Sequence, residues 1–346
     1  MNNMTKGSIG TLNDIPFLNL SQAGGKFCSS LNFFKEGEWR IWLSLGDGRF
    51  VETYGWPAEG CYFGDAAQQE TDVYLHFMDF IAQKASYEEV SKPFLGLHDD
   101  LCNLSASLAK ISHIHKTKDV LGVGDSRMVV TEVEYFFSVC RSMIDLFQEI
   151  ACKLWNKLTI YVDYLPEKKN LRNSFREMVW YKDRLTTKEE LQSRFGLPEP
   201  WADFYLRHAD FFLQIRKFRD NIVHNGSQVQ TIFSGESGYL VNLNFKPFGD
   251  VKVWRESDKV KNDLVPLMPA LGMIAFMTLL VCEDFSEMMQ RTFEFPEPIV
   301  PGMRLFTRGF FDEHFVAVLG DARDRYVEFY QGGVESEGIK AAPSLQ

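Results

Sequence analysis

The chain has 346 residues, of which 45% are hydrophobic and 24% are charged, and this balance excludes an intrinsically disordered protein. Its 30 Phe, 12 Tyr and 7 Trp provide enough apolar surface for more than one core, so two or three domains are expected. The net charge of −10 excludes a protein that its overall electrostatic field would draw onto nucleic acid.

The charges are distributed unevenly along the chain. Residues Asp47–Asp100 contain 11 acidic and 3 basic side chains, whereas residues Glu167–Arg194 contain 8 basic and 5 acidic ones. A polyanion would therefore have to contact the middle of the chain, where phosphate contacts would be local. A solvated, slightly basic helical face explains the same segment equally well.

The cysteine pattern favours a reducing compartment. None of the 6 cysteines belongs to a CxxC pair or a regular disulfide framework. The N-terminal sequence MNNMTKGSIG lacks the apolar segment of a secretory signal. We therefore expect a cytoplasmic protein that binds no metal and no cofactor.

Residues 1–95 are predicted to form a small α/β domain. Alternating apolar residues in Trp39–Leu45 and Phe50–Tyr54 flank Gly46–Gly48, which indicates a β-hairpin. A helix across Thr71–Ala85 is expected to follow, because its apolar residues recur on one face.

Residues 96–292 are predicted to form a helical bundle. Apolar residues recur at steps of three and four from Ser126 to Leu158, which is typical of one long amphipathic helix. Three further helical segments are expected, a polar one over Glu167–Leu185, one that begins after Pro200 and ends at Asn225, and one over Met268–Thr292.

Two β-hairpins are expected beside these helices. The first is an insertion at about residues 228–255, formed by Val229–Phe233 and Tyr239–Phe245. The second lies in residues 293–346, which are predicted to be a C-terminal hairpin and tail. The fold class predicted from the whole pattern is mainly α, an up-and-down helical bundle with an inserted β-hairpin and flanking small α/β segments.

One apolar segment resembles a membrane span in composition. Residues Leu264–Cys282 run for 19 residues without a charge, which is the lower limit of a transmembrane length. Pro266 and Pro269 interrupt its start, and the flanking charges are acidic, without the Lys and Arg that anchor a span. The segment is therefore predicted to be a buried helix, and no membrane partner is expected.

A cluster of polar residues closes the third predicted helix. The sequence KFRDNIVHNG places Arg219, Asp220 and His224 just before the helix stop at Asn225-Gly226. This arrangement resembles the HEPN family, whose members carry an Arg, a polar residue and then a His near the end of a late helix. The resemblance covers roughly the helices between Ser126 and Thr292, and it implies an up-and-down bundle that dimerises.

The resemblance implies metal-independent RNA cleavage by a homodimer. His224 would transfer a proton and Arg219 would bind the phosphate, which leaves a 2′,3′-cyclic phosphate on the product. Asp220, which lies four residues before His224 on the same helix face, could orient the imidazole. Asn225 is a supporting residue. Arg219 lies about 140° around the helix from His224, so two copies would have to complete one site.

Other features are weaker candidates. Arg141 and Asp145, spaced for an i,i+4 pair, are either supports of the site or an ordinary surface pair. Arg308 and His314 repeat the Arg–His spacing, but Gly309 follows the Arg, so we interpret this match as chance. His113 and His115 would share a strand face but lack a third metal ligand.

The Leu121–Ser126 segment contains a lone GxG that is more typical of a plain loop than of a phosphate site.

Two alternatives to the ribonuclease hypothesis stay open. The first is a non-catalytic HEPN-like scaffold that dimerises or binds a ligand or a protein partner. The second is an unrelated helical protein in which Arg219 serves only as a surface ion-pair partner and His224 only interacts with the helix dipole. If the chain is a ribonuclease, a role in toxin–antitoxin systems, phage defence or stress response is expected, with RNA as substrate and an antitoxin as a further protein partner.

Overall fold

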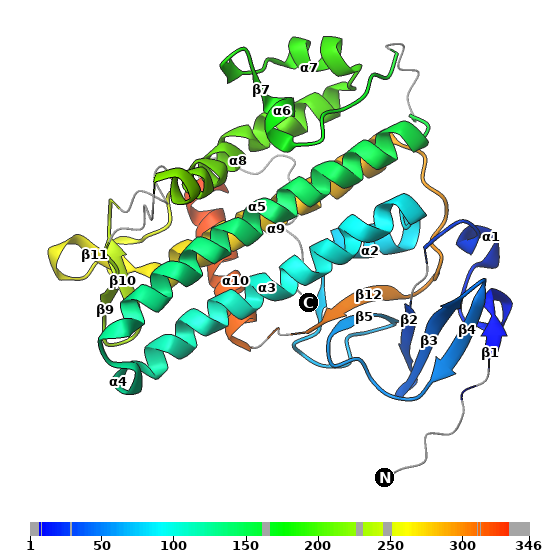
Figure 1. Cartoon of the computed structure of the whole chain (residues 1–346), viewed down its shortest axis with the longest axis horizontal. Coiled ribbons are helices and arrows are strands. Elements are labelled where there is room, and N and C mark those ends of the chain that lie inside the picture. The colour runs from blue at the N-terminus through cyan, green and yellow to red at the C-terminus, as the bar shows by residue number, and fades with distance from the viewer. Residues whose placement is uncertain are drawn as a thin grey trace.

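The structure is a computed structural model that describes residues 7, 9–27, 30–160, 167–225, 231–244, 251–309, 311 and 313–331. For residues 123 and 218–225 it describes the backbone but not the side chains. Two layers can be followed in Figure 1, a group of long helices and a mixed β-sheet packed against one end of that group.

The long helices α3, α5, α8 and α9 lie alongside one another (Figure 1). Helices α5 and α8 run antiparallel, because Gln148 contacts Tyr205 and Trp155 contacts Trp201. The helices of the described residues are α1 Leu20–Ala23, α2 His76–Lys84, α3 Ser91–Lys116, α4 Lys118–Leu121, α5 Asp125–Lys157, α6 Phe175–Val179, α7 Lys188–Phe195, α8 Glu199–Asn225, α9 Leu267–Thr292 and α10 Glu313–Tyr326, which ends in a π-helical turn at Val327–Gln331.

Helix α5 forms the centre of this layer. Its predicted apolar stripe is buried throughout, from Val133 through Phe137 and Phe147 to Leu154. Phe147 meets Phe285 of α9, and Leu154 is followed by Trp155, which packs on Phe293 directly after α9. The prediction of a long amphipathic helix over this segment is confirmed.

The described strands form one large sheet and two small ones. The large sheet is seven-stranded with the order β1-β4-β3-β2-β5-β12-β6, and only its β2–β5 pair is parallel. A three-stranded sheet has the order β11-β10-β9, and β7 pairs with β8. The strands are β1 Ile9–Thr11, β2 Ser30–Lys35, β3 Glu38–Gly46, β4 Arg49–Thr53, β5 Gly60–Gly64, β6 Val73–Tyr74, β7 Trp180–Tyr181, β8 Arg184–Leu185, β9 Phe233–Ser234, β10 Tyr239–Asn242, β11 Leu264–Pro266 and β12 Arg304–Arg308.

The large sheet overturns the prediction of a mainly α fold. The protein is an α/β fold, in which the predicted β3–β4 hairpin is only part of a seven-stranded mixed sheet. Strand β12 lies between β5 and β6, more than 200 residues away along the chain, with Leu305 opposite Phe63 and Phe306 opposite Tyr74. Such a strand has no local partner, so a sequence pattern alone cannot place it in a sheet.

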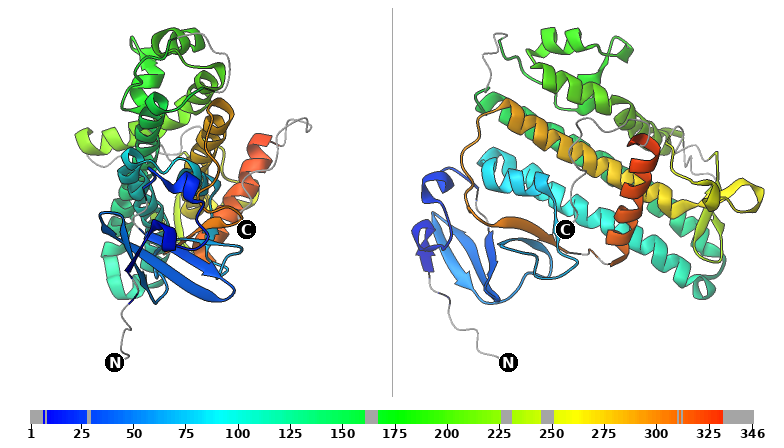
Figure 2. Two further views of the ribbon diagram at one scale, coloured as in Figure 1. Left: turned by 90° about the vertical axis from the view of Figure 1, so that its right-hand side faces the viewer. Right: turned by 180° about the vertical axis from the view of Figure 1, so that it is seen from behind.

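The ends of the chain therefore share one core rather than forming separate units. Residues 1–95 and 293–346 were predicted as separate units, but both contribute strands to the large sheet, because β12 pairs with β5 and β6. The expected C-terminal hairpin is wrong, since residues Glu313–Tyr326 form helix α10. Seen from behind in Figure 2, α10 crosses α9, and Leu319 and Ala322 of α10 are buried.

Two more local predictions are wrong. Residues Glu167–Leu185 are not one helix, because only Phe175–Val179 is helical and a tight turn at Lys182–Asp183 joins β7 to β8. Both residues of this turn have positive φ angles, of 49° and 60°, which is typical of a two-residue hairpin loop. His113 and His115 lie in helix α3 rather than on a strand.

The predicted insertion hairpin is present with shorter strands, and it is attached to the corner between α3 and α5. Tyr239 donates a hydrogen bond from Oη to Oδ2 of Asp125 at 3.1 Å. The carbonyl oxygen of Gly235 lies 2.9 Å from Nε2 of His115 and accepts a hydrogen bond of 2.9 Å from Lys118 Nζ. The hairpin is thus fixed to the helices through its turn.

Helix α9 is long and apolar enough to cross a membrane, and it is the only such helix among the described residues. The share of its most apolar window that is buried inside the protein is 72%. Strand β11 leads directly into it, and Pro266 occupies the position before its first residue. The prediction that this segment is a buried core helix is confirmed.

Candidate functional site

The predicted catalytic residues lie in the last two turns of α8. The backbone is helical as far as Asn225, and the predicted helix stop at Asn225-Gly226 falls at the limit of the described residues. The side chains of Arg219, Asp220, His224 and Asn225 lie outside the described part of the chain. Their position is therefore known only through the helix that carries them and through the described residues around it.

Helix α5 carries the predicted supporting pair. Arg141 Nε lies 3.3 Å from Asp145 Oδ2, and the two side chains retain 21% and 34% of their exposure. The pair therefore forms as its i,i+4 spacing predicts. Both residues line a pocket of about 910 Å³ on the face of α5 that points away from its buried stripe.

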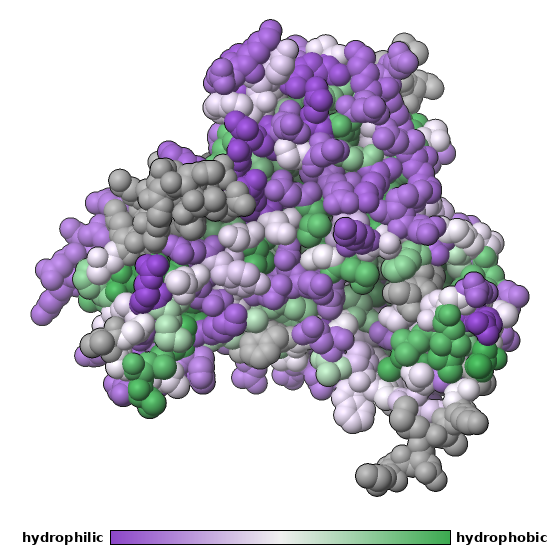
Figure 3. All heavy atoms as spheres, viewed as in Figure 1, coloured by the Kyte–Doolittle hydropathy of each residue, from purple (hydrophilic) through white to green (hydrophobic). Residues whose placement is uncertain are grey.

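Polar side chains dominate the lining of this pocket, which we call the α5 pocket. Figure 3 shows a largely hydrophilic surface over α5 and the segment α6–α7. Asn173 and Ser174, which precede α6, close one side of the pocket. The polar residues that α5 contributes are Ser138, Arg141, Ser142, Asp145, Glu149, Lys153 and Asn156.

The carboxyl group of Asp145 has an unusual electrostatic position. Burial raises its pKa above the ordinary range, although Arg141, the backbone of Phe175 and Arg216 all act to lower it. A carboxyl group of this kind binds and releases a proton closer to neutral pH than a surface Asp does. Arg216 belongs to α8, so the α5 pocket lies within electrostatic reach of that helix.

Arg216 also connects the pocket to the predicted catalytic residues. It precedes Arg219 by three residues and Asp220 by four, which corresponds to about one helical turn. Asp145 thus lies within electrostatic reach of Arg216, which precedes His224 by eight residues on the same helix. The sequence analysis missed Arg216, although its spacing from Arg219 is a signal that could have found it.

A buried glutamine fixes the rim of the pocket. Gln148 Nε2 donates to the carbonyl oxygen of Arg172 at 2.7 Å, and its Oε1 accepts a bond of 2.8 Å from Tyr205. Cys152 Sγ lies 3.2 Å from the same carbonyl oxygen. These contacts hold the loop before α6 against α5, and no local sequence signal predicts them because the partners are about 20 or more residues apart.

The side chains of this loop give the rim a basic character. Arg172 and Arg176 are exposed, and neither forms an ion pair with a carboxylate among the described residues. Arg194 of α7 lies over the ring of Tyr181 at 3.9 Å. Arg184 and Lys188 of the same basic segment pair with Glu190 and Glu199, so part of its predicted basic excess is neutralised by carboxylates.

The other sequence candidates have structural roles or none. Arg308 is buried in a two-point ion pair with Asp72, so the second Arg–His match is not a site. His115 holds the β9–β10 turn, and His113 is exposed on α3. Residues Gly122–Gly124 form a short turn between α4 and α5. No group of three metal-ligating side chains occurs among the described residues.

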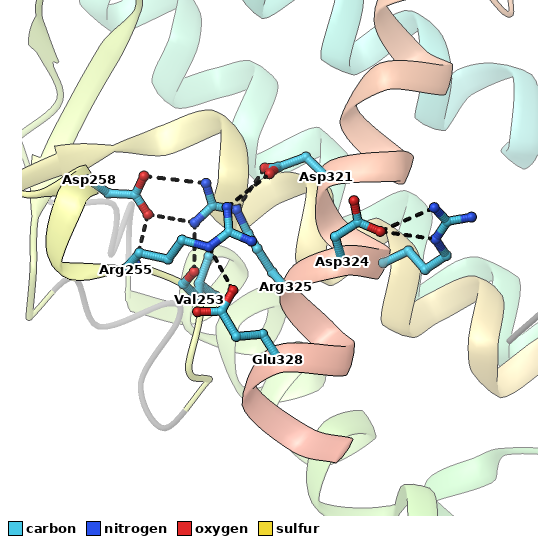
Figure 4. A network of polar contacts seen from close by, with 8 residues as sticks. Val253, Arg255, Asp258, Asp321, Asp324, Arg325 and Glu328 are labelled. Atoms are coloured by element: carbon cyan, nitrogen blue, oxygen red, sulfur yellow. Dashed lines mark hydrogen bonds and ion pairs between the residues drawn. The ribbon is translucent and has the colours of Figure 1, made fainter. Parts of the chain in front are cut away.

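A second polar network serves to attach α10. Arg325 is buried and bonds to Asp258, to Asp321 and to the carbonyl oxygen of Val253 (Figure 4). Arg255 contacts Glu328 at 2.7 Å in the same network. Each charge there has an opposite partner, which is typical of a structural connection rather than of a ligand site.

Comparisons with known proteins assign no family. No family model matches the chain, and neither the curated proteins nor the solved structures searched contain a match. The resemblance to the HEPN family therefore stays a prediction that rests on the residues at the end of α8.

Proposed function

We propose that the chain is a metal-independent endoribonuclease of the HEPN type, with the end of α8 and the α5 pocket as its site. One observation carries the proposal. Asp145, from the pair predicted to support the site, lines a large polar pocket and feels the charge of Arg216, one turn before Arg219. The end of α8 and the supporting pair on α5 would then belong to one site, since α5 packs against α8.

The proposed reaction needs no group other than the RNA and the protein. The ribose 2′-oxygen attacks the adjacent phosphorus, the bond to the 5′-oxygen breaks, and a 2′,3′-cyclic phosphate and a 5′-hydroxyl form. His224 moves the proton between these oxygens, and a pKa near neutrality suits that task. Arg219 binds the non-bridging phosphate oxygens and stabilises the charge that develops on them.

The α5 pocket would hold the RNA next to the cleaved bond. Its volume of about 910 Å³ lies within the range of ligand sites and accommodates a nucleotide. Asn173 and Ser174 in the pocket wall can form hydrogen bonds with ribose or base, and the exposed Arg172 and Arg176, next to them along the chain, can contact phosphates. These local contacts offset the acidic balance of the whole chain.

The active form would be a homodimer in the cytoplasm. The positions of Arg219 and His224 are about 140° apart around an ideal helix, so a second copy would supply the missing partner at each site. The described cysteines all carry free thiols, which suits a reducing compartment.

The α5 pocket also favours the non-catalytic alternative in one respect. It contains the carboxylates of Asp145 and Glu149, which repel a polyanion. In that case the pocket would serve a binding scaffold, and the dimer would form without cutting RNA.

Cleavage of end-labelled single-stranded RNA in EDTA tests the proposal. We expect wild-type protein to cut and both His224→Ala and Arg219→Ala to lower the rate by about 100-fold or more. His113→Ala and Arg207→Ala are matched controls, because His113 is exposed on α3 and Arg207 is exposed at the opposite end of α8. These controls should cut like wild type.

Two results would contradict the proposal. Folded wild-type dimer that leaves a range of RNAs intact would favour the scaffold. Cleavage that survives both substitutions would mean that other residues carry the chemistry.

A further inference from the structure

The structure contains a second cavity, which shares no lining residue with the α5 pocket. It has a volume of about 240 Å³ and lies between the sheet and the helices. The first two turns of α3, the end of α2, and strands β2, β5 and β12 enclose it. We call it the seam cavity.

The sheet opens at this place. Strands β2 and β5 pair only at Phe33–Phe63 and Phe34–Gly64, and they separate toward the cavity. Asn32 Nδ2 bridges the opening through a hydrogen bond of 2.7 Å to the carbonyl oxygen of Cys61. The side-chain amide of Asn32 thus bonds to the backbone of β5 where the β2–β5 pairing ends, and the space beside it stays unfilled.

Apolar side chains form most of the cavity wall. Well-packed protein cores contain few voids larger than a water molecule, so a cavity of this size is a notable departure. An apolar cavity of about 150 Å³ already accepts benzene, and the seam cavity is large enough for a fused two-ring molecule. The apolar wall residues are Phe27, Leu31, Phe63, Phe94, Ile299 and Leu305.

Polar groups at the cavity lack partners. Ser86 Oγ is buried and has no hydrogen-bond partner among the described residues, although a buried hydroxyl without a hydrogen bond destabilises a protein. Glu59 is exposed at the cavity rim and has no ion-pair partner in the described part of the chain. Burial raises the pKa of the Cys61 thiol to about 12, so this wall residue is neutral.

The charges decide the chemical class of the ligand. Glu59 is the only acidic residue among those that line the cavity, and no Lys or Arg lines it. His98 also lines it, and Nδ1 of this imidazole lies 3.7 Å from Asp99 Oδ1. An anion would therefore be repelled, while a ring with an N–H group can bond to both Glu59 and Ser86.

We propose that the seam cavity binds a small, planar heteroaromatic molecule that is neutral or weakly basic and carries an N–H group. The ring lies against the apolar wall, Ser86 Oγ bonds to a ring heteroatom, and Glu59 accepts the N–H. This proposal is independent of RNA cleavage, because its measurement is binding alone.

Calorimetric titration with 2-aminobenzimidazole as the probe tests the proposal. Wild type should bind it, and indole-2-carboxylate, an anion of similar shape, should not bind measurably. Ala82→Leu places a larger side chain in the cavity and should abolish binding, whereas Ser86→Ala should weaken it about tenfold. Ala106→Leu on α3, outside the cavity lining, is the matched control and should bind like wild type.

Three results would overturn the proposal. They are no saturable binding of the probe to wild type, equal binding of the anion, or unchanged binding by a folded Ala82→Leu variant. If Ala82→Leu fails to fold, Ser86→Leu, four residues further along the chain, fills the cavity instead. Unchanged binding of the probe by that variant would also overturn the proposal.

Discussion

Two arginine–aspartate pairs in this molecule have opposite characters. Asp72 is almost fully buried beside Arg308, with side-chain exposures of 1% and 7%. It accepts two bonds from Arg308, at 2.8 and 2.7 Å, one from Tyr62 at 2.7 Å and one from the amide of Gln69 at 2.9 Å. Asp145 has one ion-pair contact among the described residues, at 3.3 Å from Arg141, and it lines a pocket.

The pKa shifts of the two aspartates follow from this difference. Burial acts to raise the pKa of Asp72, but the bonds from Arg308 and Tyr62 outweigh it and the pKa is lowered. At Asp145 burial prevails over Arg141, and the pKa is raised. The first pair therefore stabilises the fold, whereas the second holds a carboxyl group in an unfavourable state, which is typical of a functional site.

Removal of Arg308 should have the largest effect on stability. Arg308→Ala leaves Asp72 buried and charged without its partner, which should cost about 3–5 kcal/mol of unfolding free energy. The guanidinium also lies over the rings of Trp39 and Tyr62 at 4.9 and 5.4 Å, so those contacts are lost as well. Urea unfolding measures the difference.

Arg323→Ala is the matched control for that substitution. Arg323 pairs with Asp324 at 3.1 Å on the surface of α10, and its loss should change stability by less than about 0.5 kcal/mol. A loss at Arg308 no larger than that at Arg323 would remove the contrast between the buried and the exposed ion pairs.

Replacement of Asp by Asn should affect the unfolding free energy differently in the two pairs. Asp72→Asn removes a charge that the fold stabilises, so it should lower the unfolding free energy at pH 7 by about 1–3 kcal/mol. Asp145→Asn removes a charge that the fold opposes, so stability should stay level or rise.

The pH dependence separates the two cases further. A lowered pKa contributes stability above the unfolded value, near pH 4, and loses it as the pH falls through the folded value. The deficit of Asp72→Asn should therefore shrink in acid. For Asp145 the unfavourable contribution is present at neutral pH and disappears below about pH 4. A neutral-pH stability loss at Asp145 as large as that at Asp72 would mean that both pairs are structural.

The features that could be predicted from the sequence are those that depend on residues close together along the chain. The α5 stripe and the Arg141–Asp145 pair are both set by steps of three or four residues, and the described structure contains them. Strand β12 and the bond from Gln148 to Arg172 depend on residues distant in sequence, and no local pattern reports them.

The prediction of a hairpin where helix α10 lies was wrong for a different reason. Its segment from His314 to Leu319 contains a short continuous apolar run, as a buried strand does, yet Phe315, Leu319 and Ala322 also lie on one helix face. Packing of that face against α9 decides between the two readings, and this packing is a tertiary contact that the local pattern does not contain.

A third pair, His76 and Glu283, is expected to have the smallest effect on the unfolding free energy. Nδ1 of His76 lies 3.2 Å from Oε2 of Glu283, Nε2 of His76 contacts Gln290, and the imidazole is 36% exposed. Glu283 chiefly raises the pKa of His76, with Asp79 and Glu287 acting in the same direction.

A raised histidine pKa contributes stability that is complete below the unfolded pKa, about 6.5, and is lost as the pH rises through the folded pKa. His76→Gln should therefore lower the unfolding free energy by more at pH 5.5 than at pH 9, by an amount on the order of 0.5 kcal/mol for a partly exposed pair. Urea unfolding at the two pH values measures it, with His113→Gln on the exposed face of α3 as the control. Equal losses at both pH values would show that His76 acts through packing alone, and the ranking of the three pairs by electrostatic coupling would then hold only for the two arginine pairs.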